Sequence, residues 1–373
     1  MKKILYLVST LQKAGPVNQL SYIIKYLDKT KFEPIILTLS PEPQKSMKEY
    51  FLNELDIRVE TIGLSKIKGL FFSLNKIENF ILENKIDMIH SQGFRADVLS
   101  SKIKINIPKI ATIRNYPQLD FPMTYGTVKG KIMTYMQIKA LKKLNVCCGV
   151  SNAVENNLKN NFKLNNTMTV RNGVDINKYF KINKEAKKQL REKNSIPTNK
   201  NVWITSIGKD LRKDSVSIAK AFRKLYKEDS NHYIIFLGEG ALKKECQTIL
   251  SDIKDCLFTG KIDNVVDYLQ ISDYFISASK AEGLPNAVLE AMACGLPQIL
   301  SDIPPHKEII QLDKNIGILF ELGNIDELYK GMKQILNLEY EDVSKDIINI
   351  VNKNLEASQM SKQYQNIYLK LLN

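Results

Sequence analysis

The chain has 373 residues, of which 44% are hydrophobic and 25% charged, so it is expected to fold as a globular protein and is neither disordered nor fibrous. A chain of this length indicates two domains, and no apolar run approaches the ~20 residues that span a bilayer. The net charge of +14 favours an anionic partner such as a phosphorylated substrate, a nucleic acid or membrane lipid.

The basic residues are mostly Lys and are unevenly distributed. Only seven of the 54 are Arg, whereas proteins that read nucleic-acid bases rely on the bidentate Arg side chain, so we expect no nucleic-acid partner. Residues 98–150 hold nine basic residues and one acidic residue, Asp120, which gives this segment a net charge of +8. Between Ile132 and Leu144, Lys and apolar residues interleave as in a basic amphipathic helix. Such a helix can lie on an anionic membrane, although an ordinary helix packed on the core has the same pattern.

Short apolar segments alternate with helical periodicity along almost the whole chain. In the first half, strands are predicted at Lys3–Val8, Pro34–Leu39, Val59–Ile62, Met88–His90, Ile110–Ile113, Val146–Val150 and Met168–Val170. In the second half, they are predicted at Val202–Ile207, Tyr233–Leu237, Leu257–Thr259, Tyr274–Ser277, Gln298–Leu300 and Gly317–Phe320. The helices predicted between them include Gln19–Leu27, Leu74–Glu83, Ser215–Tyr226 and Asp326–Leu336. This alternation is typical of an α/β protein whose parallel sheets have helices on both faces.

A polar segment, Lys181–Asn201, separates the predicted strands into two groups. Thirteen strands are too many for one open sheet, so we expect two Rossmann-like domains that face a central cleft. Their expected ranges are residues 1–180 and 181–355, with a C-terminal helix at 356–373 that packs back on the first domain. In open parallel sheets ligands bind beyond the carboxyl ends of the strands, so we expect the substrates to lie in this cleft.

The cysteines and the N-terminal segment both indicate a cytoplasmic protein. The five cysteines form no CxxC pair and lie in apolar surroundings, as reduced core residues do. The first residues imitate a signal peptide, but the apolar run ends at Val8 and no small-residue cleavage site follows. A first β-strand explains this segment better.

The segment from Ser279 to Gly295 carries the clearest chemical signal. It follows a predicted strand and is predicted to form a loop and then a short apolar helix, with Pro285 suited to the first helical position and Gly295 to the left-handed position after the helix end. Backbone N–H groups at residues 283–287 would then be available to bind phosphate or hydroxyl oxygens.

Two carboxylates, Glu282 and Glu290, lie eight residues apart in this segment. Glu290 falls on a helix otherwise built from Ala, Val, Leu and Met, where a buried carboxylate needs hydrogen-bond donors. The hydroxyl groups of a ribose or a sugar would supply them. For Glu290 alone, an exposed position or a pair with a nearby Lys is the alternative.

Glu282 and Glu290, with Gly-Leu-Pro-Asn between them and Ala-Met-Ala-Cys-Gly after them, closely resemble the EX7E motif of the family 4 (GT4) glycosyltransferases, which are retaining enzymes of GT-B fold. Further segments resemble motifs of that family in the same order over nearly the whole chain: Gly149-Val150-Ser151, Asn172-Gly173-Val174-Asp175, Leu237-Gly238-Glu239-Gly240 and Thr259-Gly260-Lys261. Members associated with bacterial surface polysaccharides have sequences of this type.

The resemblance implies a role for each part of the motif. Glu290 would hold the ribose hydroxyls of a nucleotide-sugar, and Glu282 would hold the transferred sugar together with Gly283, Leu284, Pro285 and Asn286. Lys261 and Gly15 would contribute to donor binding. The cations on the diphosphate would come from Lys209, Arg212 and Lys213, although their spacing departs from the family pattern and leaves open which of them bind. A solvated charge run is the alternative for these three residues.

Two residues at predicted strand ends are assigned to the acceptor or the cleft. The strand that usually delivers a His in this family delivers Arg114 here, which would bind an anionic group of the acceptor or pair structurally with an acid. His90, at another strand end, is expected to line the cleft. No His, Asp or Glu cluster has metal-ligand spacing, so we expect a reaction without metal or cofactor.

The sequence therefore predicts a retaining hexosyltransferase-type enzyme (EC 2.4) that moves a sugar from a nucleotide-sugar, expected to be a UDP-sugar, to a lipid-linked or saccharide acceptor in cell-surface polysaccharide synthesis. The basic segment 98–150 would hold it peripherally on the inner face of the cell membrane. Two alternatives stay open: a nucleotide-sugar epimerase on the same fold, and a catalytically silent membrane-associated nucleotide-sugar-binding protein.

Overall fold

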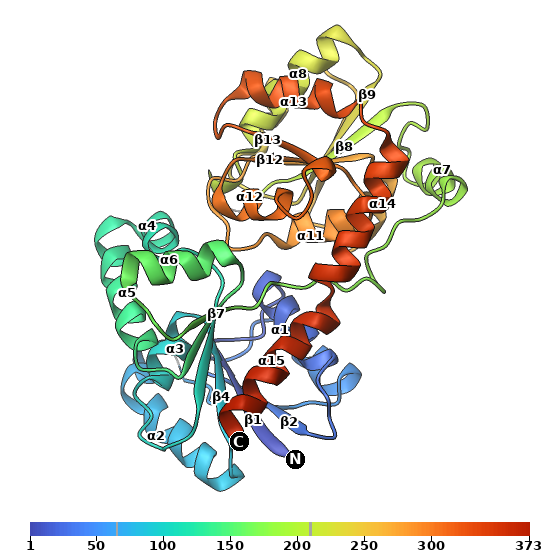
Figure 1. The fold of residues 1–373 in the computed structure, drawn as a ribbon. Helices are drawn as coiled ribbons and strands as arrows, with labels where there is room; N and C mark the ends of the chain where they lie inside the picture. The colour runs from blue at the N-terminus through green and yellow to red at the C-terminus, as the bar shows by residue number, and fades with distance from the viewer. Residues whose placement is uncertain (65, 209–210) are drawn as a thin grey trace. The chain divides into compact units, whose positions relative to one another are not determined.

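The computed structural model describes residues 1–64, 66–208 and 211–373, and these form two compact units (Figure 1). The first unit comprises Met1–Gly173 and Ala357–Asn373, and the second comprises Val174–Glu356. The C-terminal helix therefore belongs to the first unit, and the chain passes from the first unit to the second at residue 173, somewhat before the expected boundary.

The first unit is a parallel sheet with the strand order β3-β2-β1-β4-β5-β6-β7. Its strands are β1 (Lys2–Val8), β2 (Phe32–Thr38), β3 (Arg58–Thr61), β4 (Met88–Gln92), β5 (Lys109–Ile113), β6 (Val146–Gly149) and β7 (Thr167–Thr169). Its helices are α1 (Gly15–Lys25), α2 (Lys66–Asn84), α3 (Phe94–Ser100), α4 (Pro117–Tyr125), α5 (Thr127–Leu141), α6 (Asn152–Phe162) and α15 (Ala357–Leu372).

The second unit repeats this architecture with the strand order β10-β9-β8-β11-β12-β13, again with every pair parallel. Its strands are β8 (Asn201–Ser206), β9 (His232–Leu237), β10 (Cys256–Gly260), β11 (Tyr274–Ser277), β12 (Gln298–Ser301) and β13 (Gly317–Phe320). Its helices are α7 (Lys184–Lys193), α8 (Ser215–Glu228), α9 (Lys243–Ile249), α10 (Val265–Ile271), α11 (Asn286–Ala293), α12 (Pro304–Ile310), α13 (Ile325–Ile335) and α14 (Tyr340–Ile350).

All thirteen predicted strands are confirmed, each within two residues at either end. They are recognisable because a strand buried on both faces is a continuous apolar run. In β1, alternate residues enter different cores: Ile4 and Tyr6 pack with α1 and α15, whereas Leu5 and Leu7 pack with residues of α2 and α3. In the second unit the strand order reverses between β8 and β11, which is where ligands bind in sheets of this kind.

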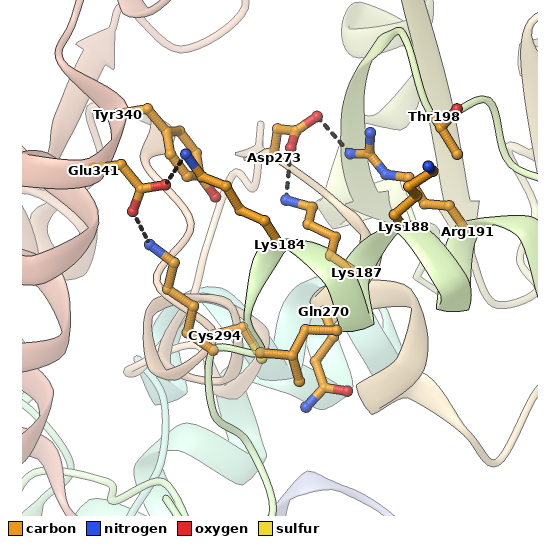
Figure 2. Close-up of a pocket in the computed structure, with 12 residues that line it drawn as sticks. Lys184, Lys187, Lys188, Arg191, Thr198, Gln270, Asp273, Cys294, Tyr340 and Glu341 are labelled. Carbon is orange, nitrogen blue, oxygen red and sulfur yellow. Dashed lines mark hydrogen bonds and ion pairs between the residues drawn. The ribbon is translucent and has the colours of Figure 1, made fainter.

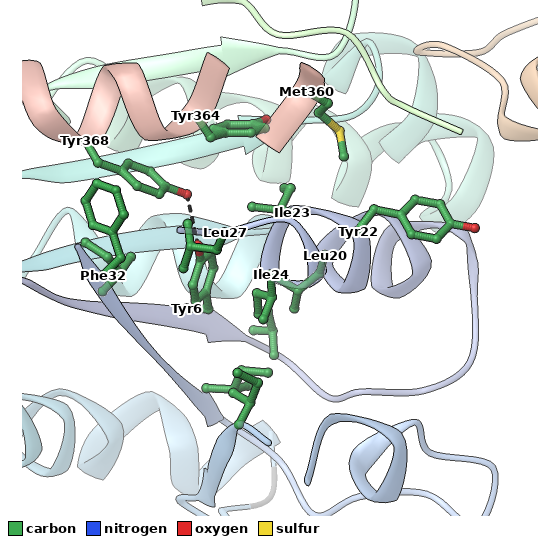
Figure 3. Close-up of a cluster of buried hydrophobic side chains, with 14 of the residues drawn as sticks. Tyr6, Leu20, Tyr22, Ile23, Ile24, Leu27, Phe32, Met360, Tyr364 and Tyr368 are labelled. Carbon is green, nitrogen blue, oxygen red and sulfur yellow. Dashed lines mark hydrogen bonds between the residues drawn. The ribbon is translucent and has the colours of Figure 1, made fainter. Parts of the chain in front are cut away.

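Helix α15 completes the core of the first unit from the far end of the sequence (Figure 3). Tyr364 and Tyr368 lie over β1, where the hydroxyl groups of Tyr368 and Tyr6 are 3.2 Å apart. Ser361 donates a hydrogen bond to the carbonyl oxygen of Ile23, which ties α15 to α1. Among the described residues, no helix combines the length and the apolar content that crossing a bilayer requires.

Within the basic segment, residues 98–150, the helices α4 and α5 meet at very close range. Gly126, with a φ of 83°, separates them, and Gly130 of α5 lies against the backbone of α4. A Cβ atom on Gly130 would be 2.3 Å from the backbone nitrogen of Pro122. Only glycine fits at this contact.

Replacing Gly130 with Ala is therefore expected to destabilise the protein, because α4 and α5 would have to move apart. Overpacking of this kind costs about 1–3 kcal/mol, which exceeds the 0.5–1 kcal/mol that Ala usually gains over Gly within a helix. Urea-induced unfolding measures the effect. Gly331→Ala is the matched control, because a Cβ atom at that position of α13 has the side chain of Ile318 as its nearest neighbour, 3.3 Å away. Equal stability of the two variants would contradict the expectation.

Candidate active site

The segment with the two carboxylates folds as a strand, a loop and a short helix. Strand β11 ends at Ser277, and α11 begins at Asn286, one residue after the predicted start, with Pro285 as its N-cap residue. Gly295 follows the helix with a φ of 75°, as predicted from its position. The loop therefore starts at the carboxyl end of a central strand, where the fold places ligands.

Glu282 forms an ion pair with Lys213 at the edge of this loop. The Lys213 Nζ atom lies 2.7 Å from the Glu282 Oε1 atom, and both side chains are mostly buried. Burial acts to raise the pKa of Glu282, but the Lys213 ammonium and a hydrogen bond from Ser279 outweigh it and hold this pKa below its usual range. The site thus contains a fixed carboxylate and a fixed cation side by side.

His306 of α12 is a neutral acceptor beside this ion pair. Its Nδ1 atom lies 2.9 Å from the carbonyl oxygen of Ser301, so this nitrogen carries the proton. Burial lowers the pKa of His306 to about 4, although the nearby Glu282 carboxylate opposes the shift. The buried Nε2 atom has no hydrogen-bond partner among the described residues and remains available to accept one.

Glu290 is held in a different electrostatic state from Glu282. Burial raises the pKa of Glu290 to about 7, against the opposing effects of the Lys178 ammonium and a hydrogen bond from Tyr179. This carboxyl group is only half ionised near neutral pH. Additional donors, such as a pair of hydroxyl groups, would stabilise its charged form.

A cavity of about 240 Å³ adjoins Glu290. Its lining is mostly apolar and comes from the carboxyl ends of β8 and β9, the loop after β10, and α10 and α11. The residues are Ser206, Leu237, Gly238, Lys261, Ile262, Val265, Leu269, Phe275, Ala287 and Glu290. A flat, partly apolar group with a hydroxylated neighbour fits such a lining.

Two glycines bring the loop after β8 close to the loop after β9. A Cβ atom on Gly240 would be 1.7 Å from the carbonyl oxygen of Gly208, and a Cβ atom on Gly208 would be 2.4 Å from the side chain of Lys213. Because Gly240 has no side chain, the loop after β9 can approach Gly208. Because Gly208 has none, the side chain of Lys213 can fold back over it. This contact explains the Gly-Glu-Gly segment at the end of β9 in structural terms.

The structure places the remaining predicted donor residues as follows. Lys209 lies outside the described residues, while Arg212 and Lys213 form a 3-10 turn whose Arg212 carbonyl accepts a hydrogen bond from the backbone N–H of Lys280. Lys261 is exposed at the cavity beside Glu290. Gly283, Leu284 and Pro285 are buried in the loop before α11. Gly15 lies in the first turn of α1 in the first unit, so its donor contact stays a prediction.

Arg114 lies at the carboxyl end of β5, where attraction to the buried Asp97 partly opposes the effect of burial on its charge. Its guanidinium donates hydrogen bonds to the side-chain oxygens of Gln92, at 2.8 Å, and Asn172, at 3.2 Å. Burial lowers its pKa to about 10, and no carboxylate in the described part of the chain forms an ion pair with it. The alternative of a structural pair with an acid is therefore not what the structure shows.

The expectation that His90 lines a cleft is wrong. Its side chain is fully buried inside the first unit, where its two ring nitrogens lie 2.7 Å from the hydroxyl oxygens of Tyr368 and Thr112. Burial lowers the pKa of His90 to about 3, so it stays neutral. Its role is to join α15 to the sheet.

A second cavity in the second unit, of about 330 Å³, has a structural explanation (Figure 2). Each of its two carboxylates bridges two cations. Asp273 binds Lys187 and Arg191, and Glu341 binds Lys181 and Lys184. These ion pairs attach α7 to its neighbours, so we do not include this cavity in the candidate site.

Three residues of the site were not found from the sequence. Lys178 and Tyr179 closely follow the Asn-Gly-Val-Asp segment, and this closeness to a family motif was the only sequence signal that could have pointed to them. His306 follows β12 by five residues, but an isolated His carries no spacing pattern that would have identified it.

Comparisons with known proteins agree with this geometry. The family model described as Glycosyltransferase Family 4 matches residues 14–178, and the one described as Glycosyl transferases group 1 matches residues 186–353. The O-antigen biosynthesis glycosyltransferase WclY of Escherichia coli is 24% identical over 99% of this chain and 98% of its own.

Two further relatives extend the comparison. The UDP-Gal:alpha-D-GlcNAc-diphosphoundecaprenol alpha-1,3-galactosyltransferase of Escherichia coli is 28% identical over 49% of this chain and 46% of its own. The crystal structure of Anabaena Alr3699/HepE in complex with UDP superposes on the whole of both chains with a TM-score of 0.83 and 17% identity, which establishes the GT-B fold. The chain belongs to the family 4 glycosyltransferases, and it is a hexosyltransferase-type enzyme of GT-B fold.

Proposed function

We propose that this enzyme is a retaining glycosyltransferase that uses a UDP-sugar and extends a lipid-linked saccharide in cell-surface polysaccharide synthesis. The observation that carries the proposal is the arrangement of the fixed Glu282–Lys213 pair and the Glu290 cavity on one loop and helix. This arrangement provides a place for each part of a nucleotide-sugar.

The assignment of parts follows from their chemistry. The cavity of about 240 Å³ would take the nucleobase, and Glu290 would accept hydrogen bonds from the two ribose hydroxyls. Lys213 would face the diphosphate, with Arg212 beside it, while Glu282 and His306 Nε2 would accept hydrogen bonds from the transferred sugar. UDP as the nucleotide is supported by the HepE complex and by the UDP-galactose named for the Escherichia coli relative.

The reaction requires one bond to break and one to form at the anomeric carbon of the sugar. The bond to the diphosphate oxygen breaks, the acceptor hydroxyl oxygen bonds on the same face, and its proton passes to the departing phosphate. Negative charge develops on the diphosphate, and a preorganised cation such as Lys213 stabilises it in the transition state. We propose that these fixed cations act without a metal ion, so that EDTA leaves the rate unchanged.

A lipid-linked acceptor is supported by the relatives and by Arg114. Two relatives carry names that specify transfer to diphospho-undecaprenol-linked sugars. Such an acceptor has a diphosphate, and the Arg114 guanidinium, whose hydrogen bonds go to the neutral side chains of Gln92 and Asn172, offers a positive charge at the carboxyl end of β5. We further propose that the lysines of residues 98–150 hold the enzyme at the inner membrane face where this acceptor lies.

Replacing Arg114 with Gln is expected to raise the KM for a diphosphate-linked acceptor about 10–100-fold, because a charge-assisted hydrogen bond to phosphate is lost. Hydrolysis of the donor in the absence of acceptor should be unchanged. Steady-state kinetics with varied acceptor measures both. Arg58→Gln, at an exposed position of the same unit, is the control. An unchanged acceptor KM would exclude Arg114 from acceptor binding.

The donor is tested by thermal shift against UDP-, GDP-, ADP- and CMP-linked sugars with EDTA present. A ligand that binds the folded state raises Tm by mass action, so a shift confined to UDP-sugars is expected, followed by transfer to a short diphosphate-linked saccharide. A shift without transfer to any acceptor would favour a catalytically silent binding protein. Interconversion of the free donor would favour an epimerase.

A further inference from the structure

Exposed apolar side chains gather on α4 and α5. Of the large apolar side chains that are exposed in the described part of the chain, half lie between residues 119 and 136. They are Leu119, Met123, Tyr125, Val128, Ile132, Tyr135 and Met136. Exposed apolar residues normally occur singly, and a group of this size marks an interaction surface.

Over residues 127–137, helix α5 has its polarity reversed relative to an ordinary surface helix, whereas its last turn buries apolar residues in the usual way. Its outward stripe is apolar: Val128 is 75% exposed, Ile132 56% and Tyr135 67%. These positions follow the four- and three-residue spacing of a single helix face. A helix of a protein that faces only water would turn this stripe toward the core.

Up to residue 137 the inward face of α5 carries small and polar residues instead, and only its last turn buries the apolar side chains of Ile138, Ala140 and Leu141. Gly130 contacts α4, Thr134 donates hydrogen bonds to the carbonyl oxygens of Pro117 and Gly130, and Gln137 donates one to Asp97 at 2.8 Å. Because these contacts need those residues, α5 cannot rotate to bury its apolar stripe. The stripe is therefore a fixed feature of the folded surface.

Lysines surround the apolar stripe. Lys129 and Lys131 lie on its two sides, and Lys139, Lys142 and Lys143 follow at its C-terminal end. All five are exposed, and none forms an ion pair with a carboxylate within the described residues. Lys129 and Lys139 instead lie over the rings of Tyr125 and Tyr135, at 5.4 and 5.9 Å. Aromatic rings beside lysines suit the boundary between lipid headgroups and acyl chains.

We propose that α4 and α5 insert their apolar side chains into the outer part of an anionic lipid bilayer while the lysines contact the headgroup phosphates. The unpaired positive charge around an apolar centre favours a lipid surface over a second copy of this basic chain. The inference deepens the proposed membrane location and rests on it. Lysines alone would give a contact that salt abolishes, whereas insertion adds a component that salt does not remove.

Binding of the protein is tested by co-sedimentation with phosphatidylcholine vesicles that contain about 30% phosphatidylglycerol. The NaCl concentrations are about 0.1 M and about 1 M, at which exposed charges are moderately and strongly screened. The wild type should bind at both. The triple variant Val128→Ser, Ile132→Ser, Tyr135→Ser should not bind at high salt, and its affinity at low salt should fall at least about 10-fold. The reason is that each substitution removes apolar area that the proposed insertion would bury in the bilayer. Leu82→Ser, an exposed apolar residue of α2, is the control.

A second measurement does not depend on the triple variant. The only Trp, Trp203, is buried in the second unit, so a Tyr135→Trp variant supplies a single surface reporter. Its emission should shift to the blue with vesicles and be quenched by brominated acyl chains. Insertion would be overturned if about 1 M salt abolished binding of the wild type and the Trp variant showed no blue shift. It would also be overturned if the triple variant bound vesicles like the wild type, or if the wild type dimerised through this stripe and did not bind vesicles.

Failure of insertion and failure of the proposed function have different signatures. Transfer to a water-soluble diphosphate-linked saccharide without vesicles measures the proposed function alone, and the triple variant should retain wild-type turnover there. Loss of transfer by the wild type in this assay would refute the proposed function and leave the vesicle results to decide insertion.

Discussion

Replacement of Lys213 with Ala is expected to lower kcat by about 100- to 1,000-fold, which is the usual effect of removing one preorganised group that stabilises transition-state charge. Lys213 is fixed by its 2.7 Å contact with Glu282 and by its position over Gly208, so it costs little reorganisation at the moment of reaction. Donor affinity should fall much less, because charge on the diphosphate grows only as the sugar bond breaks. Steady-state kinetics at saturating donor measures the change.

Lys213 and Glu282 should also be strongly coupled. The Lys213→Ala variant leaves the mostly buried Glu282 carboxylate without its partner, so part of the loss comes from an altered sugar site. A cycle with Glu282→Gln and the double variant separates the two contributions, and the double variant should be far less impaired than the product of the single effects. Lys220→Ala on the exposed face of α8 is the control. A Lys213→Ala enzyme with more than half of wild-type kcat would rule out this role.

Replacement of Glu290 with Gln is expected to stabilise the empty protein and weaken donor binding at the same time. The pKa of Glu290 is about 7 in the folded state against an ordinary value of 4.5, so the folded state binds more protons between these two pH values. Stability therefore falls as the pH rises from about 4.5 to 7, and the loss is complete above pH 7. Gln cannot ionise and avoids this loss, which amounts to about 1–3 kcal/mol.

The Glu290→Gln substitution should raise the Tm of the empty protein but lower its affinity for the donor. At pH 8 the Glu290→Gln variant should melt about 2–4 °C higher for each kcal/mol gained, and the difference from the wild type should vanish near pH 4.5. The Kd for the nucleotide-sugar should rise about 10–100-fold, since hydrogen bonds from ribose hydroxyls to a charged group are lost. Glu192→Gln, an exposed position on α7, should change neither. A variant with lower Tm and unchanged Kd would remove Glu290 from the site.

The strands and the motif positions could be predicted because they depend on local patterns. A buried parallel strand is a run of apolar residues, and the loop that carries Glu282 directly follows one such run in the sequence. The wrong predictions concern side chains that distant parts of the chain bury. His90 ends the predicted strand and carries a polar side chain, but β4 continues to Gln92, and Tyr368 of α15, 278 residues later in the sequence, covers His90.

The same limit applies to α5 and to the partners of Glu290. The interleaved Lys and apolar residues predict an amphipathic helix, but α5 has apolar residues on both its exposed and its buried side, and which of them turn inward is decided by the specific hydrogen bonds of Thr134 and Gln137. Lys178 and Tyr179 lie more than 100 residues before Glu290, so their contact with it could not be predicted from a single sequence, although both residues closely follow the Asn-Gly-Val-Asp segment.

The return of α15 to the first unit has a consequence for synthesis of the protein. The second unit is continuous in sequence, whereas the core of the first unit needs Tyr364 and Tyr368, which are synthesised after the whole of the second unit. The second unit can therefore complete its fold while the first is still open along α1 and β1. A chain that stops before residue 357 would release a finished second unit attached to an unfinished partner, and such a product would be a target for chaperones and proteases.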